Sequence, residues 1–264
     1  MQLPLSSGIA SSLDLLPEAG STNDELRSRA DGLPDLAVVV TDNQTAGRGR
    51  LGREWIAPAG KCLAISVLLR PRLPAGQPLE PAHFGWLPLI AGVAMARAIR
   101  PLVPGRVGLK WPNDVQVDGL KVSGLLAELL PAGDAIVLGA GVNLALTEGE
   151  LPVPTATSLA LSGATLEGDE LADAVLSRYL TSLRDLYTDF VRLGADVEAS
   201  GTLSLVSDYC TTLGQEVRVQ LPGGDDLVGI ATEIDRAGRL LVRRSTDGSV
   251  TAVAAGDVTH LRYE

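Results

Sequence analysis

Residue types that mark several functional classes are scarce in this chain of 264 residues. The two cysteines, Cys62 and Cys210, lie far apart and form no metal-ligand spacing. Neither a zinc site nor a disulfide framework is therefore expected. The two histidines are His83 and His260, and the sequence has no G-x-S-x-G motif, so a serine or cysteine hydrolase has little support. We expect both histidines to be structural or surface residues.

Positive charge and long apolar runs are also limited. Lysine and arginine total 22 against 32 aspartates and glutamates, a net charge of −10. This balance predicts no nucleic-acid binding, because a phosphate backbone needs a basic surface. The longest uncharged stretch, residues 84–96, is shorter than the roughly 20 residues that cross a bilayer. Since the N-terminus has no signal-peptide pattern either, we expect a cytoplasmic protein with no membrane contact.

Hydrophobic residues make up 45% of the chain but aromatic residues only 3%, so the core is expected to be aliphatic. Thr22 with Glu25 fits a capping box that begins a short helix. Residues 1–20 are expected to be an irregular lead-in. The apolar pattern predicts strands over 36–41, 62–69, 107–111 and 115–117, and helices over 22–30, 85–102 and 169–193. Two further apolar runs cover 122–130 and 135–142.

The pattern changes near Gly214. Short runs at 216–221, 227–234, 239–243 and 250–254 are separated by Pro-Gly and Asp-Gly turns, including one at 222–226. Short strands at such spacing predict a small β-barrel. We therefore divide the chain into a domain over 1–213 and a second domain over 214–264.

The sharpest local feature is the glycine–arginine loop, Gly47-Arg48-Gly49-Arg50-Leu51-Gly52-Arg53. It contains G-x-G-x-x-G, but five residues separate it from the preceding strand and no acidic residue follows at the required distance. A dinucleotide-binding fold is therefore disfavoured. Residues 43–61 carry four basic residues and one acidic residue inside an acidic protein. Because glycine lets backbone N–H groups approach a ligand and arginine donates to anionic oxygens, we interpret the loop as an anion site rather than a solvated turn.

Three further segments are ambiguous when taken singly. Lys110-Trp111-Pro112-Asn113-Asp114 is either an ordinary turn or a group that presents an ammonium, an amide and a carboxylate to a metal–nucleotide ligand. Lys121, at the head of Lys-Val-Ser-Gly-Leu-Leu, is either a strand-end charge or a site residue. Gly139-Ala140-Gly141-Val142-Asn143 is either a plain strand end or a strand that delivers an amide.

Together these segments resemble one family, the biotin protein ligases, also called biotin–[acetyl-CoA-carboxylase] ligases. The match runs in chain order through Ser21-Thr22-Asn23, residues 44–53, residues 110–114, residues 121–126 and residues 139–143. The resemblance implies an α/β (α+β) catalytic domain on a mixed sheet, of the class II aminoacyl-tRNA synthetase type, followed by an SH3-like barrel. Since about 20 residues precede Ser21, we expect the monofunctional type without an N-terminal DNA-binding domain.

The resemblance also implies a reaction in two steps. Biotin and Mg-ATP would give biotinyl-5′-AMP and pyrophosphate. A lysine of the biotin carboxyl carrier domain of acetyl- or propionyl-CoA carboxylase would then attack the mixed anhydride and release AMP. ATP and Mg²⁺ are thus the implied co-substrate and metal, with the metal ligands left unassigned, and a homodimer is compatible with the family.

Site residues follow from the same resemblance. The implied biotin site comprises Ser21, Thr22, Asn23, Gln44, Gly47, Arg48, Lys121 and Gly124. The implied nucleotide site comprises Arg48, Arg50, Arg53, Trp55, Lys110, Asn113 and Asn143. Arg50 and Lys121 would stabilise charge that develops on the α-phosphate, and Asp114 would orient or deprotonate the incoming lysine amine. Because the adenylate must be protected from water, we expect loop 42–60 to be mobile when empty and to order on ligand binding.

Two other functions stay open. A lipoate or octanoate ligase shares the fold and the adenylate chemistry, but its long apolar acyl pocket fits poorly with the polar Ser21, Thr22 and Gln44. A non-catalytic nucleotide- or carrier-binding module would keep the glycine–arginine loop but needs neither Lys121 nor Asn113.

Two positions depart from the family pattern. Leu51 stands where many members have arginine, so one anion contact is expected to be missing. Ser123 stands where alanine or glycine is usual, and its hydroxyl is expected either to narrow the pocket or to add a hydrogen bond.

Overall fold

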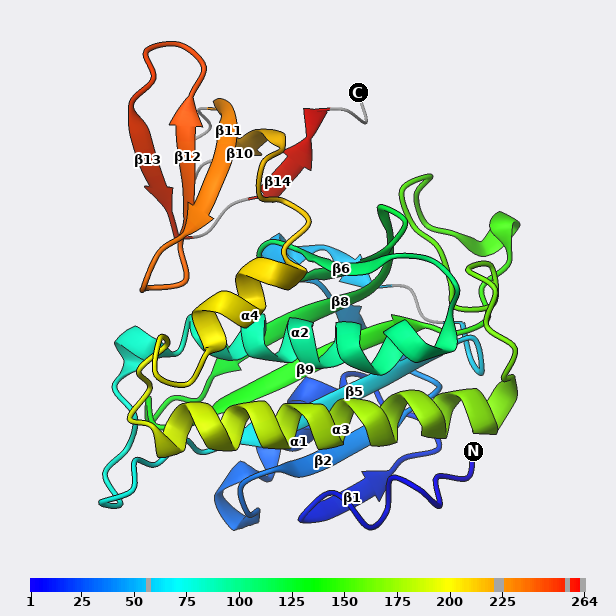
Figure 1. Ribbon diagram of the computed structural model, residues 1–264. Coiled ribbons are helices and arrows are strands. Elements are labelled where there is room, and N and C mark those ends of the chain that lie inside the picture. Colours follow the sequence, from blue (N-terminus) through cyan, green and yellow to red (C-terminus); the bar gives the residue numbers. More distant parts are fainter. Residues whose placement is uncertain (56–57, 221–225, 255–256, 262–264) are drawn as a thin grey trace.

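The computed structural model describes residues 1–55, 58–220, 226–254 and 257–261, and within them two main β-sheets are flanked by helices (Figure 1). The larger sheet has the order β1-β2-β5-β9-β8-β7-β6. Its strands are β1 (Ser12–Leu15), β2 (Ala37–Thr41), β5 (Cys62–Leu69), β6 (Val107–Lys110), β7 (Asp114–Val117), β8 (Leu120–Leu129) and β9 (Ile136–Asn143). The sheet is mixed, because β1 pairs with β2 in parallel whereas the other neighbours are antiparallel.

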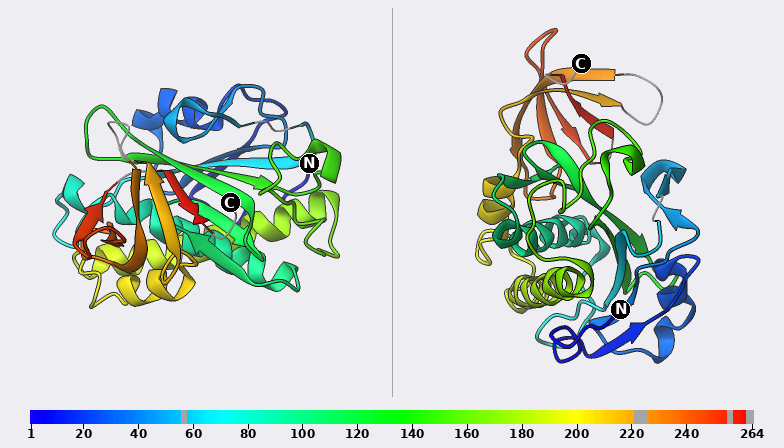
Figure 2. Two further views of the ribbon diagram at one scale, coloured as in Figure 1. Left: turned by 90° about the horizontal axis from the view of Figure 1, so that it is seen from above. Right: turned by 90° about the vertical axis from the view of Figure 1, so that its right-hand side faces the viewer.

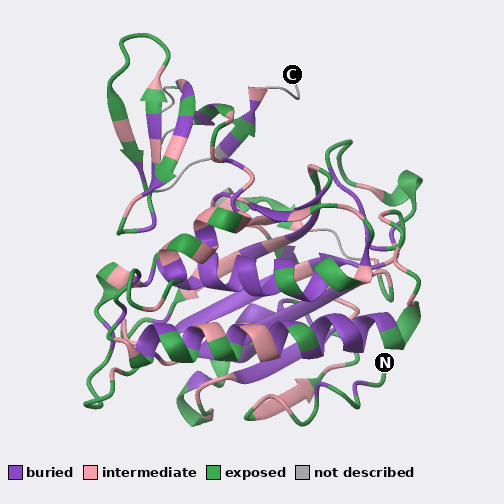
Figure 3. Ribbon diagram, in the orientation of Figure 1, coloured by how far each residue is buried: buried purple, intermediate pink, exposed green. Residues whose placement is uncertain are grey.

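Helices cover both faces of this sheet. Helices α2 (Trp86–Ile99) and α3 (Gly168–Arg192) lie side by side against one face, and α1 (Thr22–Ser28) lies on the other (Figures 1 and 2). Burial follows the predicted amphipathic pattern of α3, whose apolar stripe faces the sheet while the opposite side is exposed (Figure 3). The larger core therefore lies between the sheet and α2 and α3, and a smaller core lies under α1.

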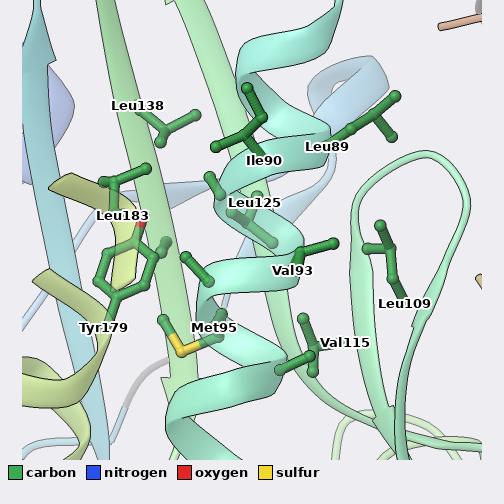
Figure 4. Packing of buried hydrophobic residues seen from close by; sticks show 14 of the residues in the cluster. Leu89, Ile90, Val93, Met95, Leu109, Val115, Leu125, Leu138, Tyr179 and Leu183 are labelled. Atoms are coloured by element: carbon green, nitrogen blue, oxygen red, sulfur yellow. The ribbon is translucent and has the colours of Figure 1, made fainter. Parts of the chain in front are cut away.

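Helix α2 is the apolar centre of the larger core. Its Ile90, Val93 and Met95 are buried, and Figure 4 shows them packed near Leu125 of β8 and Tyr179 of α3. The stretch 81–102 has 22 residues, and a window of 18 of them has a mean hydropathy of 1.3, so by length and composition it is sufficient to cross a membrane. The uncharged run of residues 84–96 is shorter because it ends before Arg97, whereas the longer stretch includes Arg97 and Arg100. Because 72% of this window is buried inside the protein, α2 is a core helix.

The structure also corrects the predicted elements near the N-terminus. The expected irregular lead-in over residues 1–20 contains β1, a short edge strand that pairs with β2. The first helix is capped by Ser21, whose hydroxyl accepts a hydrogen bond from the Asp24 amide at 3.4 Å, rather than by a Thr22 capping box. Helix α4 (Thr202–Tyr209) was not predicted at all. These elements are short and depend on contacts with distant parts of the chain.

The smaller sheet is fully antiparallel, with the order β13-β12-β11-β10-β14. Its strands are β10 (Glu216–Gln220), β11 (Asp226–Ile234), β12 (Leu240–Arg244), β13 (Val250–Val253) and β14 (Asp257–His260). Val217 and Val219 of β10 are buried while their neighbours are exposed, which is the alternation expected of a strand with one face on a core. The predicted barrel strands are confirmed, β14 was missed, and most of the predicted 222–226 turn lies outside the described residues.

Two tryptophans connect the small sheet to the large one. The indole N–H of Trp86 donates to the carbonyl of Arg236 at 2.9 Å, and that of Trp111 donates to the carbonyl of Gly238 at 3.1 Å. Both acceptors lie in the turn between β11 and β12. The small sheet is thereby fixed beside the 110–114 turn, next to the pocket described below.

Candidate active site

A pocket opens where the N-terminus of α1, the glycine–arginine loop and strands β5, β8 and β9 meet. Segments far apart in sequence form its wall, and the lining residues are Ser21, Thr22, Asn23, Gln44, Arg48, Gly49, Arg50, Trp55, Ala64, Ile65, Asn113, Lys121, Gly124, Leu125, Leu126, Gly139, Ala140 and Gly141. The fold therefore brings together parts of all five segments on which the family resemblance depends.

The glycine–arginine loop forms a small hairpin over this pocket. Strand β3 (Gly47–Arg48) pairs with β4 (Glu54–Trp55), and a 3-10 turn over Arg50–Gly52 joins them, so the glycines do not open an α-helix as in a dinucleotide-binding fold. A Cβ at Gly47 would lie 2.6 Å from the carbonyl oxygen of Trp55, which explains why no side chain fits there. The hairpin holds Arg48 and Arg50 at the pocket wall.

One end of the pocket is neutral and polar. The backbone N–H of Thr22 donates to Gln44 Oε1 at 2.8 Å, and the Thr22 hydroxyl lies 3.1 Å from the same oxygen. Asn23 donates from Nδ2 to Glu128 Oε2 at 2.6 Å. Thr22 and Asn23 are buried, so their polar atoms are positioned by the protein rather than by solvent.

Arg48, at the exposed edge of the pocket, is held by carboxylates. Its guanidinium donates to both oxygens of Asp24, at 2.5 and 2.7 Å, and lies 3.4 Å from Glu128 Oε1. The hydrogen bonds from Arg48 lower the pKa of Asp24, and the same pair raises the pKa of Arg48. A ligand anion at this position would therefore replace carboxylate oxygens that already bind the guanidinium.

The second cationic group is Lys121 on β8. Its Nζ lies 2.8 Å from Asp114 Oδ1 of β7. A Cβ at Gly124 would lie 3.0 Å from Lys121 Nζ and 3.6 Å from Asp114 Oδ1, so glycine leaves room for the ion pair. Nearby, Arg50 donates to Asn113 Oδ1 at 2.9 Å, while Asn113 Nδ2 donates to the carbonyl of Leu125 at 3.0 Å. The 110–114 turn and the arginine hairpin thus meet at one place.

Comparison with known proteins agrees with this geometry. The profile of the Biotin/lipoate A/B protein ligase family matches residues 18–143, and that of the Biotin protein ligase C terminal domain matches residues 212–261. The biotin–[acetyl-CoA-carboxylase] ligase of Mycobacterium tuberculosis is 39% identical over 95% of this chain and 89% of that protein. The chain belongs to the biotin protein ligase family. The bifunctional ligase/repressor BirA of Escherichia coli is 32% identical over 94% of this chain and 74% of that protein.

A solved structure of this family shows the same fold. The biotin protein ligase of Aquifex aeolicus in complex with biotin and ATP has a TM-score of 0.70 and 28% identity, covering 94% of this chain and 98% of that one. The expected fold class is confirmed: a mixed-sheet catalytic domain of the biotin and lipoate ligase type with an SH3-like antiparallel sheet after it.

Five of the residues predicted from the family resemblance do not line the pocket. Gly47 borders a neighbouring surface hollow instead, which it shares with the pocket residue Trp55. Asn143 is buried at the end of β9, where its Nδ2 donates to the carbonyl of Thr157 at 2.8 Å. The other non-lining residues are Arg53 after the 3-10 turn, Lys110 at the end of β6 and Asp114 behind Lys121.

Of the two departures from the family pattern, the expected effect of Ser123 can be compared with the structure. Ser123 is buried and its hydroxyl has no hydrogen-bond partner among the described residues, and Ser123 is absent from the pocket wall. The expectation that it narrows the pocket or adds a hydrogen bond was therefore wrong, because neighbouring strand residues point to opposite faces and Gly124 occupies the pocket side. The side chain of Leu51 lies outside the described residues.

Metal-binding groups and disulfides can be assessed for the described part of the chain. There, no group of three or more His, Cys, Asp or Glu side chains is placed to hold a metal ion. Cys62 and Cys210 are both free and buried, as expected from their spacing. His260 is buried, with Nε2 at 3.2 Å from Thr212 Oγ1, and is structural.

Sequence reasoning missed two polar residues next to the pocket. Ser66, in the middle of β5, contacts both Thr22 and Asn23, and Glu128, near the end of β8, contacts Asn23 and Arg48. Each is a polar residue inside an apolar strand run, and this position in the sequence is the pattern that could have identified it.

Proposed function

We propose that this protein activates biotin with ATP, forming biotinyl-5′-AMP and pyrophosphate, and then transfers biotin to a lysine of a biotin carboxyl carrier protein. The observation that carries the proposal is the pocket itself, whose wall combines the neutral polar residues Ser21, Thr22, Asn23 and Gln44 with the cationic residues Arg48, Arg50 and Lys121. A ureido ring requires donors and acceptors, whereas a carboxylate and an α-phosphate require positive charge. The named ligases of M. tuberculosis and E. coli support the same activity.

The polar end is assigned to the ureido ring of biotin. Thr22 and Gln44 would form the hydrogen bonds, with Ser21 and Asn23 beside them. Gly124 would leave space for the bicyclic ring, and Gly47 would let the hairpin close over it.

The cationic residues are assigned to the adenylation step. The carboxylate of biotin and the α-phosphate of ATP repel each other, so their approach needs positive charge between them. Arg48, Arg50 and Lys121 would supply it and would stabilise the charge that develops on the phosphate. Each is presently held by an oxygen of Asp24, Asn113 or Asp114, and ligand oxygens would take over these contacts.

The nucleotide is assigned to the side of the pocket next to the 110–114 turn. Asn113 and Trp55 line the pocket. Arg53, Lys110 and Asn143, which do not line it, are assigned to the nucleotide on the family resemblance alone. Mg²⁺ would enter bound to the ATP phosphates, which commonly supply most of its ligands apart from water.

Asp114 is assigned to the transfer step. While Lys121 is ion-paired with it, Asp114 holds the ammonium in place. Once Lys121 turns to the adenylate, the carboxylate is available to orient the amine of the carrier lysine and to accept its proton. The two roles of Asp114 follow one another.

The remaining assignments concern the whole protein. We place the catalytic domain at 1–213 and the SH3-like domain at 214–264. The expected partner is the carrier domain of acetyl- or propionyl-CoA carboxylase, reached in the cytoplasm, and a homodimer is compatible with the family. The tryptophan contacts beside the 110–114 turn support a position of the small sheet close to where the carrier would dock.

A transfer assay tests the proposal. Purified protein, Mg-ATP and a biotin carrier domain are incubated with biotin or with lipoate, and the carrier is weighed by mass spectrometry. We expect the carrier to gain one biotinyl group, and a variant carrier without its target lysine to gain none. Gain of lipoate alone would support the lipoate ligase, and no gain with either acid would favour the non-catalytic module.

A further inference from the structure

Ser66 is a single polar residue inside an otherwise apolar, fully buried strand. It lies in the middle of β5, is 0% exposed and does not line the pocket. Its Oγ lies 2.8 Å from Thr22 Oγ1 and 2.6 Å from Asn23 Oδ1. Ser66 therefore contacts two pocket residues but is not itself exposed to a ligand in the pocket.

Asn23 fixes the direction of these hydrogen bonds. Its Nδ2 donates to the carboxylate of Glu128 at 2.6 Å and approaches the carbonyl of Leu126 at 3.5 Å, both of which can only accept. The amide oxygen must then face Ser66, where it can only accept as well. Because the Ser66 hydroxyl has a single hydrogen, Ser66 donates it to Asn23. The 2.8 Å contact between Ser66 Oγ and Thr22 Oγ1 then requires the hydrogen of the Thr22 hydroxyl, for which Ser66 Oγ competes with Gln44 Oε1 at 3.1 Å.

This direction determines what Thr22 offers to a ligand. With its hydrogen turned toward Ser66, the Thr22 hydroxyl presents lone pairs to the pocket and can accept from an N–H group. Gln44 is oriented in the opposite sense, because its Oε1 accepts from the Thr22 backbone and its Nε2 remains the donor. An acceptor beside a donor matches a ureido group, which has N–H donors next to a carbonyl acceptor.

A glycine opposite Ser66 supports the same arrangement. Ser66 pairs with Gly139 across the β5–β9 ladder. A Cβ at Gly139 would lie 2.5 Å from Asn23 Oδ1, so any side chain there would displace the amide. The two central strands therefore supply both the hydroxyl that orients Asn23 and the space that it occupies.

We infer that Ser66 is a positioning residue for biotin recognition: through Asn23 and Glu128 it holds the Thr22 hydroxyl as an acceptor for a ureido N–H. The inference rests on the proposed function. Without Ser66, the Thr22 hydroxyl can rotate to donate to Gln44 Oε1 at 3.1 Å, and its orientation toward the ligand is lost.

A double-mutant cycle tests this role. Ser66→Ala, Thr22→Val and the double variant are compared with the wild type in biotin-dependent ATP–pyrophosphate exchange. We expect Ser66→Ala to raise the KM for biotin about tenfold, as for one net hydrogen bond. The KM for ATP and kcat at saturating biotin should stay within about twofold. In the Thr22→Val background, Ser66→Ala should add little, because its effect acts through Thr22.

Two further variants separate positioning from folding. Ser6→Ala removes an equally buried serine, whose hydroxyl bonds to Asp173 at 2.5 Å, and should lower the melting temperature without changing the KM for biotin. Ser66→Cys keeps the volume but has a weak donor, so it covers the case in which Ser66→Ala does not fold, and should also raise the KM for biotin.

The outcomes are distinct. Additive effects of Ser66→Ala and Thr22→Val, or a parallel loss in kcat and in ATP affinity, would overturn the positioning role while leaving biotin activation intact. No biotin-dependent exchange by the wild type would overturn the proposed function, and this inference with it.

Discussion

Replacing Gly141 with alanine probes how the hairpin is held over the pocket. A Cβ at this position would lie 2.5 Å from Cζ2 and 2.6 Å from Cε2 of Trp55. Contacting carbon atoms are normally about 3.5–4.0 Å apart, so the rigid indole must move by about 1 Å. Because Trp55 pairs with Gly47 in the hairpin, the segment that carries Arg48 and Arg50 would move as well.

A displacement of about 1 Å in a group that positions substrate can lower a rate by roughly 100-fold. We therefore expect Gly141→Ala to reduce biotin-dependent kcat/KM by about 10- to 100-fold in pyrophosphate exchange. The free energy of unfolding in urea should change by less than about 1 kcal/mol, because the hairpin lies over a pocket rather than in a core. Gly149→Ala is the matched control, since nothing lies within 4 Å of its Cβ. Wild-type kcat/KM in Gly141→Ala would refute the reasoning, as would an equal loss in the control.

Three further predictions concern buried and cationic groups. Ser123→Ala removes a buried hydroxyl without a partner among the described residues, so it should stabilise the protein by about 1 kcal/mol and raise Tm by about 2–4 °C; a lower Tm in calorimetry would contradict this. Lys121→Ala should lower biotin-dependent exchange at least about 100-fold with an unchanged circular dichroism spectrum, and near-normal exchange would remove Lys121 from the chemistry. Burial raises the pKa of Cys62 to about 12 and also raises the pKa of Cys210, so at about pH 8 both thiols stay protonated and Ellman's reagent should react with neither until urea is added.

Elements with strong local patterns were predictable from the sequence. The run over β5 is continuously apolar apart from one serine, and its predicted and observed bounds agree. Helix α3 follows its apolar spacing to within one residue at each end. Strand β1 was missed because its four residues are half-exposed and are ordered by pairing with β2, which is a non-local contact. The short α4 and β14 also depend on contacts with distant parts of the chain.

The candidate site was predictable where residues of the required chemistry are neighbours in the sequence. The glycine–arginine loop and the 110–114 turn mark it by their composition, and the structure places both against the same pocket. Ser66 and Glu128 contact pocket residues that lie elsewhere in the chain; Ser66 and Asn23, for example, are 43 positions apart. Such partners are set by strand register and helix placement, so local sequence carries little sign of them.

Activation of biotin in this pocket is measured by ATP–pyrophosphate exchange. Purified wild-type protein with Mg²⁺ is offered biotin, lipoate or octanoate in parallel, with a reaction lacking any acid as the blank. We expect exchange that requires biotin and is close to the blank with the other two acids. Exchange that requires lipoate or octanoate instead, or exchange that none of the three acids supports, would contradict this expectation.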